Sequence, residues 1–274
     1  MRRFGCTFLT ISRSTLGMRY TCDLNDAQWR LINYCFPKPA QTGRPREHTY
    51  RELLNAIFYL VKTGCQWRNL PNHFAPWRTV YHYFRRWKRS GLWAALHRHL
   101  REHVRLVEGR QRQPTAGILD SQSVKSTESS DERGYDAAKK INGRKRHILV
   151  DTLGLLLWVT VLPANLQDRA GARHLLRAFF GQAPRPKVKH LWADGGYTGA
   201  LLDWARQAWR CTVEIVKRTD RHTFRVLPRR WVVERTFGWL GRYRRLSKDY
   251  ERQAHTGETF VYLAMIRLML ARLA

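Results

Sequence analysis

Residues 143–172 read GRKRHILVDTLGLLLWVTVLPANLQDRAGA, and this stretch decides the fold. The runs RHILV (146–150) and LLLWVTVL (155–162) are short, apolar and rich in branched residues, and the turn DTLG separates them, which predicts two neighbouring strands. Apolar side chains then recur at helical spacing over Asp168–Phe180, and Asn165 or Asp168 is expected to cap that helix. The stretch therefore predicts the order strand, strand, helix.

Segments on both sides extend this pattern. GILD, at 117–120, predicts an earlier strand, and the chain after residue 180 alternates again between apolar runs and helical periodicity. Strands are predicted at 189–193 and 212–216, and helices at 200–209, around Glu234 and from Glu258 to the end. The order β-β-β-α-β-α-β-α is typical of an RNase H-like α/β fold, a mixed five-stranded sheet flanked by helices. We assign this catalytic domain to residues 113–274.

The preceding residues, 18–112, predict a small all-α domain. Apolar side chains at 53–61 follow the i, i+3, i+4 rule of a core-facing helix, and residues 77–87 repeat that pattern with a basic outer face. Such a helix-turn-helix-like bundle can place one helix in a DNA major groove, although a solvated charged face is the plainer interpretation. The outer face carries Arg85, Arg86, Lys88 and Arg89, and Trp67, Trp77, Trp87 and Trp93 are expected to pack the bundle. Residues 1–17 show no period and are interpreted as a non-native or disordered extension.

The charge of the chain requires a polyanionic partner. The sequence has 50 Lys and Arg against 21 Asp and Glu, a formal net charge of +29. Basic residues outnumber acidic ones by 21 to 6 before Thr115 and by 29 to 15 from Thr115 onward, so the excess covers both halves. Nucleic acid running across the whole molecule explains this distribution better than a single charged tail does. A ribosomal-type protein and an anionic-membrane-binding protein are the alternatives.

Cysteine usage and hydropathy indicate the compartment. The five cysteines form no CxxC pair and leave one unpaired, which argues against a disulfide framework or a cysteine zinc site. No stretch approaches the roughly 20 uninterrupted apolar residues of a membrane span. We therefore expect a soluble cytoplasmic protein that has no membrane partner.

Three acidic residues stand where the predicted topology brings strand and helix ends together. Asp120 ends the first predicted strand, Asp194 ends the fourth, and Glu234 lies on the late helix. Gly195-Gly196 follow Asp194 and leave room for a phosphate backbone to approach. Singly, each acid has an ordinary interpretation as a turn former or a solvated residue; together they predict one site.

Three neighbouring carboxylates indicate a divalent metal. With ordinary pKa values near 4 they would be ionised and would repel one another without cations. Mg²⁺ takes oxygen ligands, and two such ions about 3.5 to 4 Å apart can activate a water or a 3′-hydroxyl and stabilise the leaving oxygen. We expect two Mg²⁺ ions, replaceable by Mn²⁺, with Asp120, Asp194 and Glu234 as metal ligands and catalytic residues.

Several longer stretches carry a family resemblance. They are WRNLPNHFAPWRTVYHYFRRW, GILDSQSVKS, residues 143–172, ADGGYTG and WVVERTFGWLGRYRRLSKDYE. In these the chain resembles the insertion-sequence transposases of the IS-five family, within the DDE recombinases, from about Met18 to the C-terminus. The resemblance implies Mg²⁺-dependent cleavage and strand transfer at terminal inverted repeats, and it assigns the catalytic triad to Asp120, Asp194 and Glu234.

The resemblance also implies partners and marks two departures. The partners are double-stranded DNA, both element ends and target, and a second copy in a homodimeric synaptic complex in the bacterial cytoplasm at the nucleoid. Related elements place a basic residue seven positions after the glutamate, where this chain has Gly241 followed by Arg242. They place a tyrosine seven positions before it, where this chain has Leu227; the arginine four positions before it is present as Arg230.

Further cationic residues are candidates for DNA contact. A basic run enters the strand at 146–150, near the proposed active edge, and a DNA-backbone contact is the preferred interpretation over a solvated face. This run comprises Lys139, Lys140, Arg144, Lys145 and Arg146. On the late helix, Arg230 shares a face with Glu234 by i+4 spacing and Arg242 lies about a turn beyond. We expect these two, together with Arg235, to bind phosphates.

Two rival functions stay open, and two features are set aside. An inactive transposase remnant would bind DNA without cutting, and a plain metal-dependent nuclease would cut without joining. The intact triad counts against the first, and the basic N-terminal region counts against the second. His99 and His103 have zinc-binding spacing without an obvious third ligand, and Asp151 is interpreted as a turn former.

Overall fold

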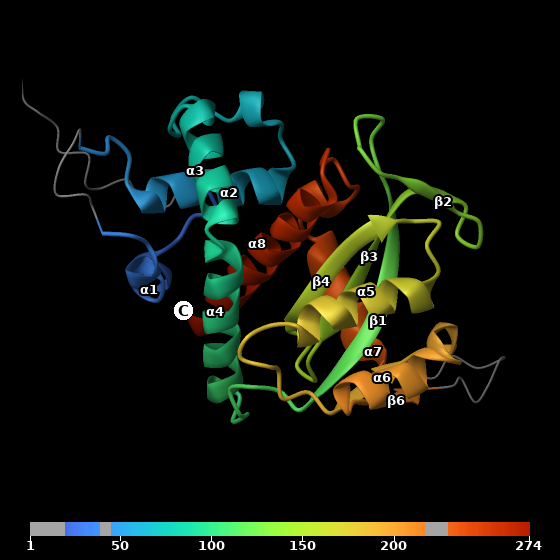
Figure 1. Ribbon diagram of the computed structural model, residues 1–274. Coiled ribbons are helices and arrows are strands. Elements are labelled where there is room, and N and C mark those ends of the chain that lie inside the picture. Colours follow the sequence, from blue (N-terminus) through green and yellow to red (C-terminus); the bar gives the residue numbers. More distant parts are fainter. Residues whose placement is uncertain (1–19, 39–44, 217–229) are drawn as a thin grey trace, which may run out of the picture.

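The computed structural model describes residues 20–38, 45–216 and 230–274 (Figure 1). The predictions for residues 1–17 and for Leu227 lie outside these ranges. The α-helices are α1 (Asp26–Arg30), α2 (Tyr50–Thr63), α3 (Trp77–Arg89), α4 (Leu92–Val107), α5 (Asp168–Phe180), α6 (Leu201–Trp209), α7 (Arg230–Gly241) and α8 (Ala254–Leu273). The strands are β1 (Ala116–Lys125), β2 (Gly134–Asp136), β3 (Ile141–Val150), β4 (Leu156–Pro163), β5 (His190–Ala193) and β6 (Thr212–Ile215). Short 3₁₀ turns are η1 (Asn33–Cys35), η2 (Trp67–Asn69), η3 (Gly195–Tyr197) and η4 (Arg244–Leu246).

The strands form one mixed sheet. Its order is β4-β3-β1-β5-β6, and β3 pairs antiparallel with both β1 and β4, whereas β1, β5 and β6 run parallel. This is the strand order and direction expected for the predicted RNase H-like arrangement. The sequence missed one strand: the short β2 pairs with the first residues of β3, on the same side as β4, so the sheet has six strands rather than five.

Helices cover both faces of the sheet. On one face α5 and α6 pack over Leu119 and Leu149, and the apolar helix residues close a core that includes Leu175. On the other face α7 and α8 pack over Ile118 and Ile148. Neighbouring strand residues alternate between the two cores, as the period of a strand requires. One face of β1 therefore packs under α7 and α8, and the other packs under α5 and α6.

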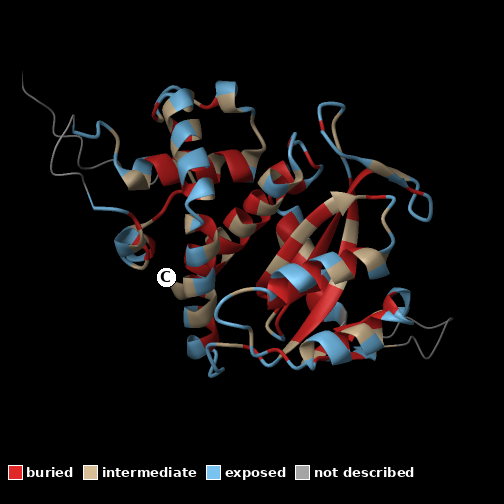
Figure 2. Cartoon of the chain, in the orientation of Figure 1, coloured by how far each residue is buried: buried red, intermediate tan, exposed pale blue. Residues whose placement is uncertain are grey.

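Helix α8 joins the sheet to the N-terminal helices. It packs against β4 on one side and against α2 and α4 on the other, and Figure 2 shows it buried along most of its length. A single apolar core consequently runs from the N-terminal helices through α8 to the sheet. Among the described residues, no helix is both long and apolar enough to span a bilayer.

Local sequence signals mark the ends of two helices. Asn25 caps α1 with a reciprocal capping box to Gln28, and Gly64 ends α2 in the left-handed conformation, at φ +73°. The predicted cap of α5 is wrong. Gln167 occupies the N-cap position without a side-chain hydrogen bond, and Asp168 is the first helical residue. The side chain of Asp168 is thereby available for other contacts.

Two arginines of β3 are buried beneath the segment that joins α7 to α8. The Arg144 guanidinium donates to the carbonyl oxygens of Glu132, Glu251 and Arg252 at 2.7, 2.7 and 2.6 Å, and its Nη1 lies 3.5 Å from Asp249 Oδ2. Both residues of that ion pair are about 1% exposed. A buried cation is tolerated only where its donors are satisfied, and here backbone carbonyls satisfy them.

Arg146 lies two residues further along β3, on the same face of the sheet as Arg144, and is also buried. Its guanidinium donates to the carbonyls of Leu246 and Lys248 at 2.8 and 3.1 Å, and burial lowers its pKa to about 10. The prediction that Arg144, Lys145 and Arg146 lie in a loop and contact DNA is therefore corrected. All three are in β3 and nearly inaccessible to solvent, so a DNA backbone cannot reach them in this conformation.

We predict that Arg144→Met lowers the free energy of unfolding by about 3 to 5 kcal/mol, because it leaves Asp249 buried without its cation and three carbonyls without donors. Urea denaturation followed by circular dichroism measures the change. Arg252→Met is the matched control, since Arg252 and Asp131 form an exposed ion pair at 2.7 Å, and it should change the midpoint little. Equal small effects of both substitutions would contradict the anchoring role of Arg144.

Candidate active site

The parallel pairing of β1 with β5 sets the geometry of the acidic site. Ile118 pairs with Trp192 at the end of the ladder. Continuing that register by two residues puts Asp120 opposite Asp194, on neighbouring strands about 4.8 Å apart. The two carboxylates predicted from the sequence therefore lie at the same edge, and both residues are partly exposed.

The strand that carries Asp120 is longer than predicted. Asp120 was expected to end its strand, but β1 continues to Lys125 because β3 stays paired with it along that length. What ends near Asp120 is the pairing with β5. Asp120 consequently lies at the point where the sheet opens between β1 and β5.

Asp194 stands at the turn that follows β5, as predicted. It is the N-cap of η3, and its Oδ1 accepts a hydrogen bond from the Gly196 backbone N–H at 2.9 Å. A Cβ at Gly195 would have no neighbour within 4 Å, so the surface beside Asp194 is open. The two glycines thus leave the carboxylate accessible from outside, as their small size suggested.

Asp168 is an acidic site residue that the sequence interpretation missed. A Cβ placed on Gly196 would lie 3.1 Å from Asp194 Oδ1 and 3.7 Å from Asp168 Oδ2, so the two carboxylates flank the same point. The Oδ1 atom of Asp168 accepts from Ser121 Oγ at 2.8 Å and from Lys145 Nζ at 3.1 Å. One oxygen is thus anchored to the sheet while the other faces Asp194.

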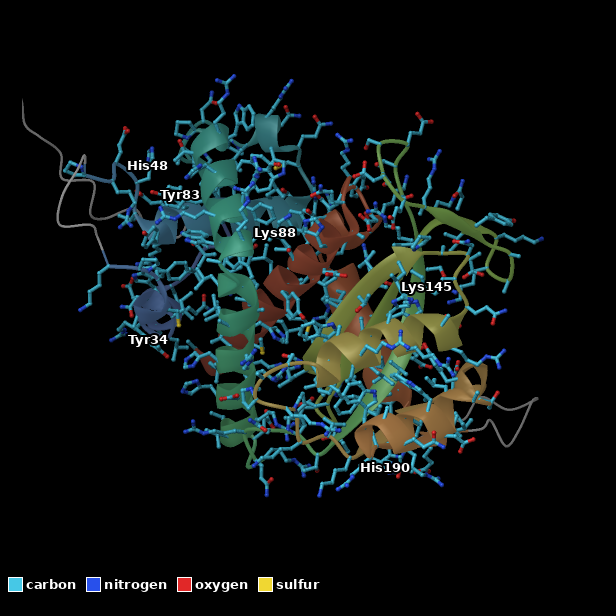
Figure 3. The ribbon with its side chains drawn as sticks, viewed as in Figure 1. Tyr34, His48, Tyr83, Lys88, Lys145 and His190 are labelled. Carbon is cyan, nitrogen blue, oxygen red and sulfur yellow. The ribbon has the colours of Figure 1, made fainter. Side chains whose placement is uncertain are left out.

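Lys145 is the cation of a buried network behind these carboxylates (Figure 3). Its Nζ also lies 3.5 Å from Asp136 Oδ2 and donates to the Leu166 carbonyl at 3.0 Å. Asp136 in turn accepts from Ser123 Oγ at 2.6 Å. The network ties β2, β3 and the start of α5 together on the face opposite α7. The sequence shows the basic run that contains Lys145. It does not show that the Lys145 side chain points into the protein.

Tyr197 is a buried tyrosine whose pKa is affected by the charges of the acidic site. Its side chain is buried, and its pKa is raised well above the ordinary tyrosine value by burial and then by the negative charges of Asp120, Asp168 and Asp194. The hydroxyl lies beside Ser121 without a hydrogen bond of normal geometry. The negative charges of Asp120, Asp168 and Asp194 thus all act on the same buried hydroxyl.

Glu234 lies on α7, which packs against β1. Val233 and Leu240 are buried on the sheet side, as predicted, and Glu234 is exposed. Asp120 lies on the face of β1 that α7 covers, because its neighbour Ser121 points to the opposite face. Over residues 20–38, 45–216 and 230–274, however, no group of three or more His, Cys, Asp or Glu side chains is arranged to hold a metal ion.

The chemistry of the donors nevertheless fits a divalent cation such as Mg²⁺. Asp120, Asp194 and the free Oδ2 of Asp168 offer carboxylate oxygens at one open edge, and Glu234 lies on the neighbouring helix. Hard oxygen ligands of this kind are the ones Mg²⁺ takes. All four of these residues are carboxylates, so the donor set contains oxygen ligands alone.

The candidate DNA-contacting residues divide into three groups. Those exposed on the surface are Arg85, Arg86, Arg89, Lys139, Lys140 and Arg242. Lys88 and Arg235 are partly buried and already engaged: Lys88 Nζ donates to Thr256 Oγ1 at 2.9 Å, and Arg235 donates to the Leu153 carbonyl at 3.0 Å between the rings of Trp231 and Trp239. The side chain of Arg230 lies outside the description, and Arg144, Lys145 and Arg146 are buried, as described above.

The two features set aside from the sequence have structural roles. Asp151 is fully buried, forms an ion pair with Arg105 and accepts from the N–H groups of Leu153 and Leu155. His99 contacts the Tyr34 hydroxyl, and His103 Nδ1 lies 3.3 Å from the His99 carbonyl. Asp151 therefore organises the turn between β3 and β4, as predicted.

Comparison with known families assigns the chain. The family described as "Transposase DDE domain" matches residues 111–269, more than half of the chain. This chain is a DDE transposase family member. A second family, described as "Putative transposase of IS4/5 family", matches residues 24–97 in the N-terminal helices. The sequence-based recognition of an insertion-sequence transposase of this type is confirmed, and with it the RNase H-like fold that the DDE domain implies.

Curated relatives agree with this membership. "Putative transposase for insertion sequence element IS402" from Burkholderia cepacia is 31% identical over 126 residues, which are 44% of this chain and 60% of the relative. "Uncharacterized protein y4sN" from Sinorhizobium fredii (strain NBRC 101917 / NGR234) is 31% identical over 72 residues, 26% of this chain and 58% of the relative. The chain thus spans about 60% of the length of these two relatives. No solved structure matches.

His147 is a buried titratable group next to the carboxylate network. It follows Lys145 by two positions in β3, and a Cβ on Gly171 of α5 would lie 2.2 Å from its ring, so only glycine fits above it. Burial lowers the pKa of His147 to about 4, against the opposing negative charge of Asp168. Burial also lowers the pKa of His97, in α4, well below its ordinary value.

We predict that acid destabilises the fold through His147. Below its ordinary pKa of about 6.5 the unfolded chain binds a proton that the folded chain excludes until about pH 4. Stability is therefore lost as pH falls through this window, by on the order of 2 to 3 kcal/mol between pH 7 and pH 4.5. Urea denaturation at both pH values should show a smaller loss for His147→Gln, whereas His174→Gln, at an exposed position of α5, should behave as wild type. An unchanged loss in His147→Gln contradicts the assignment.

Proposed function

We propose that this chain binds the terminal inverted repeats of an insertion sequence and cuts and joins DNA there with Asp120, Asp194 and Glu234. The observation that carries the proposal is the register of β1 and β5, which brings Asp120 opposite Asp194 at an open edge. Membership of the DDE transposase family supports the same reaction class. The intact triad favours an active enzyme over a binding remnant.

The carboxylates would hold Mg²⁺, with Asp120 and Asp194 contacting two ions and Glu234 one of them, and Mn²⁺ would substitute. When bound, the metal supplies activation of a water or a 3′-hydroxyl and neutralises charge on the phosphodiester. The residues of the chain position the reacting strand: Gly195 and Gly196 let its backbone approach, and the exposed cations bind its phosphates. In the first step the water oxygen bonds to phosphorus as the 3′-oxygen of the cut strand leaves. In the second, the freed 3′-hydroxyl loses its proton and its oxygen bonds to a phosphorus of the target DNA, while the P–O bond to the target's own 3′-oxygen breaks and that oxygen leaves as a new 3′-hydroxyl.

We add Asp168 to the site. Its Oδ1 is fixed by Ser121 and Lys145, and its Oδ2 faces the same point as Asp194. A carboxylate anchored at one oxygen loses little conformational freedom when the other binds a ligand. Asp168 would therefore serve as an additional carboxylate oxygen donor to the ion.

The DNA path would follow the exposed cations. Arg85, Arg86 and Arg89 on α3, Lys139 and Lys140 before β3, and Arg242 after α7 are accessible and carry the expected charge. Duplex bound in this way displaces counterions, so its affinity should fall steeply with salt. We further propose a homodimer in the synaptic complex, in which each copy holds one element end.

We predict that purified protein with Mg²⁺ cuts and joins a linear DNA carrying the element's own ends. Asp194→Asn and Glu234→Gln should each lower cleavage by at least about a hundredfold while binding persists, because each removes a ligand of a metal worth several kcal/mol to the transition state. Cleavage and joined products are resolved on sequencing gels.

Asp203→Asn is the control, since Asp203 is an exposed carboxylate on α6 outside the site, and it should cut as wild type does. Wild-type binding without cleavage would indicate a DNA-binding remnant. Cleavage without joined product would indicate a nuclease. Cleavage by both acidic-site variants at the wild-type rate would show that the assigned site is wrong.

A further inference from the structure

A groove of about 480 Å³ separates the N-terminal helices from the segment that joins η4 to α8. It lies apart from the acidic site and shares no residue with it. One wall comes from η2 and α3, and the other comes from residues 245–256. The lining residues used below are Trp67, Trp77, Tyr81, Lys88, Tyr250 and Arg252.

Aromatic faces form one wall of the groove. The rings of Trp67 and Tyr81 meet edge to face with centroids 5.0 Å apart, and Trp67, Trp77 and Tyr81 are each only half-buried. Trp67 and Trp77 pack against the core as expected but remain partly exposed, whereas Trp87 and Trp93 are fully buried, also as expected. Tyr250, on the opposite wall, is 38% exposed.

Cations surround these aromatic faces. Arg85 lies 5.7 Å from the Tyr81 ring centroid, and Arg252 comes from the opposite wall. The Lys88 ammonium donates to Thr256 Oγ1 and keeps two further donors for another acceptor (Figure 3). The one acidic residue of the lining, Glu251, is buried and paired with Arg245 at 2.6 Å, so it does not cancel the other charges.

The combination selects a ligand that has both a flat ring and an anion. Half-exposed aromatic rings offer stacking surfaces, and three cations offer phosphate contacts: Arg85, Lys88 and Arg252, the last of which is paired with the exposed Asp131. The volume falls within the roughly 300 to 1,000 Å³ of sites that take ligands of this size. A base within a duplex hides its faces in the stack, so the fitting form is an unpaired nucleotide.

We infer that this groove binds an unpaired nucleotide of a DNA strand, its base stacked on Trp77 or Tyr81 and its phosphate on Lys88, Arg85 or Arg252. The choice of DNA as the source rests on the proposed function. The groove also depends on the buried arginines, because Arg144 holds the carbonyls of Glu251 and Arg252 in the opposite wall.

The test uses fluorescein-labelled deoxythymidine 10-mer, which needs neither element ends nor catalysis, and measures its affinity by fluorescence anisotropy at fixed salt. Trp77→Leu and Tyr81→Leu should each weaken binding roughly 5- to 100-fold, the effect of losing one stacked base. Trp204→Leu is the matched control, because Trp204 is also half-buried and lies near two arginines, but on α6. It should bind the 10-mer as wild type does.

Binding of a fully paired duplex should change little in the two groove variants. If the 10-mer binds all variants equally, or if duplex affinity falls by the same factor, the groove does not hold an unpaired nucleotide. A transposase that fails to cut leaves this result intact, so the two proposals fail separately.

A second experiment uses only the wild-type chain and therefore does not require that a variant folds. A 5-iododeoxyuridine 10-mer is photo-crosslinked to it, and the crosslinked residues are mapped. Mass spectrometry should place crosslinks on Trp67, Trp77, Tyr81 or Tyr250. Crosslinks confined to other peptides would overturn the inference.

Discussion

The buried guanidinium groups of β3 hold this molecule together. Arg144 and Arg146 donate to five backbone carbonyls, four of them in the segment that joins α7 to α8. Without that segment in place, α8 would not lie between the sheet and the N-terminal helices. Buried cations are costly unless their donors find acceptors, and here all three guanidinium nitrogens of Arg144 and two of the three of Arg146 donate to carbonyl oxygens. One wall of the aromatic groove rests on it, because Arg144 holds the carbonyls of Glu251 and Arg252.

The carboxylates and the aromatic groove lie in different parts of the molecule. At the edge between β1 and β5, carboxylates converge, and the network of Lys145 and Ser121 supports them from the α5 face. On the other side of the molecule, α3 and the 245–256 segment bring together aromatic rings and cations. Because α8 packs against β4 on one side and against α2 and α4 on the other, the N-terminal helices and the sheet share one apolar core.

Apolar periodicity predicted the order of strands and helices, and the ends of Asp168–Phe180 match the structure. The strand order also predicted that Asp120 and Asp194 lie at the same edge, although Asp120 stands within β1 rather than at its end. The direction in which a side chain points was harder to predict. A basic run looks the same in sequence whether it faces DNA or a carbonyl-rich segment a hundred residues away, so Arg144 and Arg146 were misplaced. Asp168 was missed because a helix-starting aspartate has a common capping role, and β2 because three residues carry no period.

The central claim is that Asp120, Asp194 and Glu234, with Asp168, surround one divalent-metal centre. Iron-mediated cleavage tests it directly: Fe²⁺ replaces Mg²⁺ in the purified protein, ascorbate and peroxide generate hydroxyl radicals at the bound ion, and mass spectrometry maps the cut backbone. The account predicts cuts near residues 120, 168, 194 and 234 that excess Mg²⁺ suppresses. Cuts confined to other segments, such as that of His99 and His103, or cuts that Mg²⁺ does not suppress, would contradict it.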